Sequence, residues 1–176
     1  EVTYAHDLEA REDIMAALST IAAKVGRRLR RKGLKGRTVA VKMRYDNRTT
    51  RSAQCSLAAP TDDDIAFAPV VHRLAEELWA PGMKVRLLGV AVTHFEEDGA
   101  PVQEALFDAA VLGGDGNADA VESEALIRDE EKRRSLLAAT DALQERFGDG
   151  TVRFGFELRQ SGNTTGSSSK NVEDYK

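Results

Sequence analysis

The fold of this chain is decided by residues 37–57, which read RTVAVKMRYDNRTTRSAQCSL. Apolar and polar residues alternate over 37–45 and again over 51–57, a period that is typical of half-buried β-strands. The linking residues 46–50 are turn formers, so the two strands are predicted to form an antiparallel hairpin with one apolar, covered face. The other face is predicted to carry cations and small polar groups without a carboxylate, namely Thr38, Lys42, Arg44, Arg51, Ser52, Gln54 and Ser56.

A long helix is predicted before this hairpin, over residues 7–32. Its apolar residues recur at helical spacing and form one stripe of Ile14, Leu18, Ile21, Val25 and Leu29. Asp7 can cap the start of this helix, and Gly33 can take the left-handed conformation at its end. A short strand over residues 2–5 is predicted to precede it.

A second helix and a further strand follow the hairpin. Pro69 allows either a helix that starts near this proline or a helix that kinks there, and the apolar stripe is Val71, Leu74 and Leu78. Residues 84–95 form an apolar strand typical of the centre of a sheet. The resulting order, βαββαβ, predicts an α+β fold of the split βαβ, ferredoxin-like kind, with a four-stranded antiparallel sheet and two helices on one face.

The composition changes after this predicted domain. Helical periodicity returns over residues 129–147, and a short strand is predicted over 151–158. The chain is therefore predicted to comprise a domain (1–96), a flexible acidic linker (97–125), a small helix–strand extension (126–160) and a disordered tail (161–176).

Charge is divided unevenly along the chain. Residues 1–95 hold 16 Lys/Arg and 11 Asp/Glu, a formal charge of +5, and residues 96–176 hold 9 and 18, a formal charge of -9. Between Lys24 and Arg51 lie 12 basic residues and a single acid, Asp46. Such a concentration of cations favours binding of a polyanion through its phosphates.

Several classes of protein are excluded by the composition. No apolar run approaches the roughly 20 residues of a membrane span, and no secretory signal is visible. The single cysteine, Cys55, excludes an internal disulfide and indicates a reducing compartment, so a cytoplasmic location is expected. Because the sequence lacks a starting Met, we expect it to be a piece of a longer protein.

Catalytic and metal-binding patterns are also missing from the sequence. Asp62, Asp63 and Asp64 are interpreted as helix-capping residues and not as metal ligands. The histidines are far apart and lack metal-ligand spacing, and no nucleophilic arrangement is visible. We therefore predict no catalytic residue, no metal ligand and no cofactor in this chain.

Four motifs, together with the order of the predicted elements, carry a resemblance to a known family. They are GRTV at 36–39, VKMRY at 41–45, TTRS at 49–52 and RLLGV at 86–90. Over residues 1–95 the chain resembles the little finger domain of Y-family DNA polymerases. The later segment DALQERFG at 141–148 is similar to the C-terminal extension of the bacterial DNA polymerase IV group.

This resemblance implies a role in holding DNA. The family's little finger lies along the primer–template duplex, with its free sheet face near the major groove. The palm, fingers and thumb of the same parent chain would precede residue 1, with Mg²⁺ bound in the palm, so this chain would be inactive alone. The residues that it would use to bind DNA are Thr38, Lys42, Arg44, Arg48, Arg51, Ser52, Gln54 and Ser56.

A second motif, QEALF at residues 103–107, matches the family's pentapeptide for binding the bacterial sliding clamp, the β subunit. Gln103 can hydrogen-bond at the mouth of a clamp pocket, and Leu106 and Phe107 can fill its apolar interior as anchors. Alternatively, Leu106 and Phe107 begin a small strand or helix that packs on the domain.

The predicted function is thus the DNA-gripping and clamp-binding portion of a translesion DNA polymerase that acts in DNA damage tolerance. One alternative is the same domain in a catalytically inactive, polymerase-like accessory protein. Another is an RNA-binding ferredoxin-like module. Such a module would expose aromatic residues on its central strands for base stacking, whereas the free face here carries Lys42, Arg44 and Gln54.

Overall fold

The computed structural model describes residues 1–95, 118–148, 151–152 and 164–167. The chain divides into two compact units. One unit comprises residues 1–96 and 153–176, and the other comprises residues 97–152.

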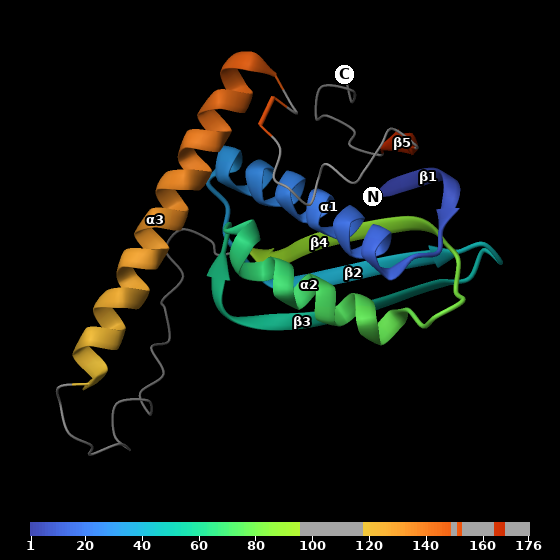
Figure 1. Cartoon of the computed structure of the whole chain (residues 1–176), viewed down its shortest axis with the longest axis horizontal. Helices are drawn as coiled ribbons and strands as arrows, with labels where there is room; N and C mark the ends of the chain where they lie inside the picture. Colours follow the sequence, from blue (N-terminus) through green and yellow to red (C-terminus); the bar gives the residue numbers. More distant parts are fainter. Residues whose placement is uncertain (96–117, 149–150, 153–163, 168–176) are drawn as a thin grey trace. The chain divides into compact units, whose positions relative to one another are not determined.

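The first unit is built on an antiparallel sheet. Its elements are β1 (Val2–Leu8), α1 (Arg11–Lys32), β2 (Gly36–Tyr45), β3 (Thr50–Thr61), α2 (Asp64–Leu78), β4 (Val85–Phe95) and β5 (Thr164–Ser167). The strand order is β3-β2-β4-β1-β5, and neighbouring strands are antiparallel. Both helices lie on the same side of the sheet (Figure 1). The predicted βαββαβ fold is confirmed.

The hydrophobic core lies between the sheet and the two helices. The apolar face of the predicted hairpin is buried as expected, since Val39, Val41 and Met43 have no exposed surface. The Tyr45 hydroxyl is also buried and donates a hydrogen bond of 2.6 Å to the carbonyl of Leu78 in α2. The helices contribute a complementary set of buried side chains, including Ile14, Leu18, Ile21, Leu29, Val71, Leu74 and Leu78.

The start of α1 differs from the prediction. Asp7 belongs to β1 and does not cap the helix, which begins at Arg11 after Ala10 in an extended conformation without a side-chain cap. The strand extends to Leu8 because it pairs with β4 as far as Val85. The predicted end is confirmed: Gly33 has a φ of 64° and its backbone N–H donates to carbonyls of the last turn.

Helix α2 starts well before Pro69, at Asp64. Pro69 lies on an exposed part of the helix, where the carbonyl that loses its helical hydrogen bond can face water. The helix ends at Leu78, and Trp79 is in an extended conformation.

The later elements also differ from the prediction. Helix α3 (Ala118–Phe147) begins within the predicted linker, 11 residues before the expected start at Asp129, and ends as predicted before Gly148, which has a φ of 94°. Residues 164–167, within the predicted disordered tail, form β5 on the edge of β1. An exposed edge offers unpaired backbone groups, and the threonines of this segment favour strands. No helix among the described residues is long and apolar enough to cross a membrane.

Candidate nucleic-acid interface

The face of the sheet opposite α1 and α2 carries most of the predicted DNA-binding residues. In antiparallel pairs, directly opposed residues point to the same face. The register opposes Lys42 to Ser52 and Gly89, and Arg44 to Thr50 and Leu87. The free face therefore presents Thr38, Lys42 and Arg44 from β2, Thr50, Ser52, Gln54 and Ser56 from β3, and Leu87, Gly89 and Thr93 from β4.

Two residues of this free face are already engaged by neighbours. Thr38 is only 5% exposed, and its hydroxyl lies 3.3 Å from that of Ser56. Thr38 is therefore better placed to orient Ser56 than to contact a ligand on this face. The Lys42 ammonium forms a 2.9 Å ion pair with Glu1, and this hydrogen bond lowers the pKa of the Glu1 carboxyl. Lys42 keeps two further N–H donors for an anion.

Three arginines gather at the hairpin end of the free face. Arg44, Arg48 and Arg86 line a hollow of roughly 350 Å³. Its remaining walls come from Thr3, Asp7, Tyr45, Asp46 and Leu87. Guanidinium groups present several donors in a planar fork that matches phosphate oxygens. The hollow thus brings three guanidinium groups together with the carboxylates of Asp7 and Asp46, which offset part of its positive charge.

Arg48 is held in place by the hairpin turn. It has a φ of 65°, and its N–H donates to the carbonyl of Tyr45 over 3.1 Å. The side chain of Asn47 accepts a hydrogen bond from the N–H of Thr49, and that of Asp46 accepts one from the N–H of Asn47. These local bonds fix the turn and with it the position of Arg48.

Arg86 reaches the hollow because of a β-bulge. Strand β2 pairs Arg44 with Leu87 and Tyr45 with Val85, so Arg86 has no opposite residue. Its guanidinium donates to the carbonyl of Ala5 over 3.1 Å and to Asp7 over 3.3 Å. Arg86 belongs to the RLLGV motif at 86–90 but is not among the predicted site residues. The sequence held no clear signal for it, because the apolar run of β4 is too continuous to indicate faces and the bulge is seen only in the strand pairing.

Arg51 does not lie with the other predicted residues. It is opposite Met43, whose side chain points into the core, so Arg51 lies on the helix side of the edge strand β3. Burial raises the pKa of the Tyr45 phenol, and the positive charge of Arg51 opposes this shift. The predicted position of Arg51 on the free face is therefore wrong.

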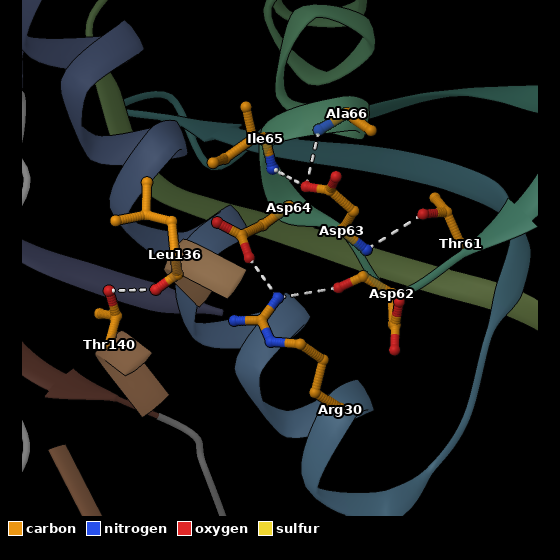
Figure 2. Close-up of polar contacts among 9 residues, drawn as sticks. All are labelled: Arg30, Thr61, Asp62, Asp63, Asp64, Ile65, Ala66, Leu136 and Thr140. Carbon is orange, nitrogen blue, oxygen red and sulfur yellow. Dashed lines mark hydrogen bonds and ion pairs between the residues drawn. The ribbon is translucent and has the colours of Figure 1, made fainter. Parts of the chain in front are cut away.

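One residue of the acidic triplet caps α2 as predicted, whereas Asp64 forms an ion pair and Asp62 contributes its backbone carbonyl (Figure 2). Asp63 caps α2 by accepting hydrogen bonds from the N–H groups of Ile65 and Ala66 at 2.9 and 3.1 Å. Asp64 is buried and accepts a 2.5 Å hydrogen bond from Arg30. No group of three or more His, Cys, Asp or Glu residues in the described part of the chain is arranged to hold a metal ion.

Replacement of Asp63 by Ala is expected to lower the free energy of unfolding by about 1 kcal/mol, because two backbone donors of α2 lose their acceptor. Urea denaturation followed by circular dichroism measures the change. Asp62→Ala is a matched control, since only the backbone carbonyl of Asp62 makes a contact within the described residues. Equal losses in the two variants would contradict the capping role.

Comparison with known proteins decides the family. Residues 1–106, more than half of the chain, match the impB/mucB/samB family C-terminal domain. The chain belongs to this family. The match covers every residue of the free face and of the hollow described above.

The relatives are bacterial polymerases. DNA polymerase IV of Lactococcus lactis is 41% identical over 96 residues, which cover 54% of this chain and 26% of that protein. DNA polymerase IV of Desulfatibacillum aliphaticivorans is 28% identical over 152 residues, which cover 86% of this chain and 34% of that protein. The chain thus spans about a quarter to a third of these relatives. Its family domain is the little finger domain of a Y-family polymerase of the DNA polymerase IV kind, as the resemblance implied.

The predicted clamp-binding residues Gln103, Leu106 and Phe107 lie outside the residues that the structure describes. The family match extends through Leu106, so it includes the start of this motif. Clamp binding therefore stays a prediction from the sequence.

Proposed function

We propose that this chain is the duplex-gripping and clamp-binding portion of a translesion DNA polymerase that acts in DNA damage tolerance. The little finger domain holds the primer–template duplex, and the segment at 103–107 recruits the enzyme to the bacterial sliding clamp. The family relationship supports the first part, because the relatives are DNA polymerases. The pentapeptide sequence supports the second.

The observation that carries the DNA proposal is the make-up of the free sheet face. Across β2 and β3 it offers Lys42 and Arg44 together with serine, threonine and glutamine side chains, and no carboxylate lies on these two strands of the face. Hydroxyls, amides, ammonium and guanidinium groups all donate hydrogen bonds to phosphate oxygens. Contacts of this kind position a duplex without reading its sequence, which a polymerase needs because it must accept any template.

The hollow at the hairpin end supplies the strongest part of this grip. Arg44 and Arg86 approach it from two adjacent strands, and Arg48 from the turn. A phosphate there receives charge-assisted hydrogen bonds, which are about twice as strong as neutral ones.

Arg44→Ala is expected to weaken duplex binding by about the same factor for every DNA sequence, because a phosphate contact carries no base information. The slope of log affinity against log salt concentration should fall by about 0.9, the value for one phosphate contact. Fluorescence anisotropy titrations with several duplexes at three salt concentrations measure both quantities.

Arg51→Ala is the matched control for this experiment. It removes the same charge from the neighbouring strand, but on the opposite face of the sheet. A smaller loss of affinity is therefore expected. An equal loss in the two variants, or a change in sequence preference for Arg44→Ala, would contradict the proposed contact.

A further inference from the structure

The outer side of α1 carries a stripe of cations that the sheet face does not explain. Lys24, Arg28 and Arg31 follow one another at spacings of four and three, so they lie on one side of the helix. Lys35 continues this series after the helix ends. All four residues are exposed, and the sequence has no Asp or Glu from residue 14 to residue 45. We call these four residues the α1 stripe.

The fold gives no structural reason for most of this stripe. A helix dipole favours cations in its last turn, which accounts for Arg31 but not for Lys24 and Arg28. Lys24 and Arg28 are four residues apart and repel each other. None of the four side chains forms an ion pair or a hydrogen bond within the described part of the chain. Arg30 on the same helix, in contrast, is paired with buried Asp64.

The α1 stripe and the free sheet face lie on opposite sides of the domain. Helix α1 packs on the sheet through buried residues such as Leu18 and Leu29, and Figure 1 shows both helices on one side of the strands. The stripe is on the exposed side of that helix. A duplex that lies on the free sheet face is therefore separated from the stripe by the sheet and the helix layer.

We propose that the α1 stripe is a second nucleic-acid-binding surface, which holds the phosphate backbone of a duplex segment that the sheet does not hold. From Lys24 to Arg31 the helix rises about 10 Å. A duplex carries one phosphate charge per roughly 1.7 Å with both strands counted, so about six phosphates lie along this length and about half of them can face the helix. Helix α1 contains no aromatic residue for base stacking, which favours a duplex backbone over unpaired bases.

The test counts how many short duplexes the full chain binds at low salt, by analytical ultracentrifugation with absorbance of the DNA. The helix variant combines Lys24→Gln, Arg28→Gln and Arg31→Gln, which keep helix propensity and remove three charges. The sheet variant combines Arg44→Gln with Arg86→Gln. We expect two duplexes per wild-type chain and one per chain of the helix variant. The salt slope for the lost duplex should account for about three phosphates, near 2.7.

A charge-matched control separates a local surface from net charge. It combines Arg11→Gln, Arg73→Gln and Lys132→Gln, which also removes three exposed cations, none of which belongs to the α1 stripe or to the free sheet face. This control is expected to keep two duplexes. If it loses one as the helix variant does, the effect comes from net charge and the α1 stripe is not a site.

The outcomes distinguish this proposal from that for the sheet. A helix variant with unchanged stoichiometry and salt slope would overturn the second surface, and a stripe that serves an acidic protein or an anionic membrane would give this result. If the helix variant loses a duplex while the sheet variant loses none, the α1 stripe is supported and the sheet proposal fails. Thermal melting of each variant verifies that its fold is retained.

Discussion

The double substitution Leu106→Ala and Phe107→Ala is expected to abolish binding of this chain to a bacterial sliding clamp. The two side chains are the proposed anchors in an apolar pocket, and anchors of this kind each contribute 2 kcal/mol or more. Loss of both corresponds to about a thousandfold or greater drop in affinity. Isothermal titration of the purified clamp with the wild-type and variant chains measures this drop directly.

The neighbouring apolar pair Val111 and Leu112 provides the matched control. Replacing both by Ala removes similar side chains a few residues after the pentapeptide, and clamp affinity should not change. The melting temperature of the Leu106 and Phe107 variant decides whether these residues are exposed clamp anchors or part of a segment that packs on the domain. A large fall would show that these residues pack on the domain, whereas an unchanged value together with lost binding fits exposed anchors.

Much of the little finger fold could be predicted because its hairpin has a strict period of two. Burial of one face of such a strand fixes which side chains point outward, and Val39, Val41 and Met43 are buried as this period requires. The same period assigns Arg51 to the side of Ala53 and Cys55. The prediction that Arg51 lies on the free face followed its charge and not this period. It is wrong, because Arg51 pairs with Met43, whose side chain is in the core.

Arg86 shows what the period could not reveal. The apolar run of β4 is too continuous to indicate faces, and the bulge that turns Arg86 toward Arg44 depends on pairing with strands distant in the sequence. The start of α2 was similarly ambiguous, because Pro69 permits two helices and the cap at Asp63 decides between them. Helix α3 starts early because six of the 11 residues 118–128 are Ala, Glu or Leu, whose helix propensity is high, although the segment lacks a clear apolar stripe.

Substitution of Arg30 by Leu is expected to have the largest effect on stability, lowering the free energy of unfolding by about 3 kcal/mol at neutral pH. Arg30 donates to Asp64 at 2.5 Å and to the carbonyl of Asp62 at 2.9 Å, and so ties the end of α1 to the start of α2 (Figure 2). The Asp64 side chain is only 7% exposed. Gly26 gives it room, because a Cβ at this position would lie 2.6 Å from its carboxylate oxygen.

The pH dependence of this loss identifies its cause. Burial raises the pKa of Asp64 above its ordinary value, and the hydrogen bond from Arg30 opposes that shift. Without Arg30 the folded-state pKa rises further, while the unfolded chain keeps an ordinary value near 4. The folded variant then binds the proton more tightly than the unfolded one. The destabilisation is therefore complete above the folded-state pKa and fades as the pH falls toward the unfolded-state value.

A second substitution separates an unpaired charge from lost packing. Adding Asp64→Asn to Arg30→Leu removes the buried charge and should restore most of the stability at neutral pH, whereas Arg31→Leu, on the exposed side of the same helix, should have little effect. Denaturant titrations from pH 4 to pH 8 measure all three variants. A loss that is independent of pH and persists in the double variant would mean that the Arg30 stem matters through its packing. In that case Asp64 would not be the reason that the last turns of α1 hold a partly buried arginine at this position.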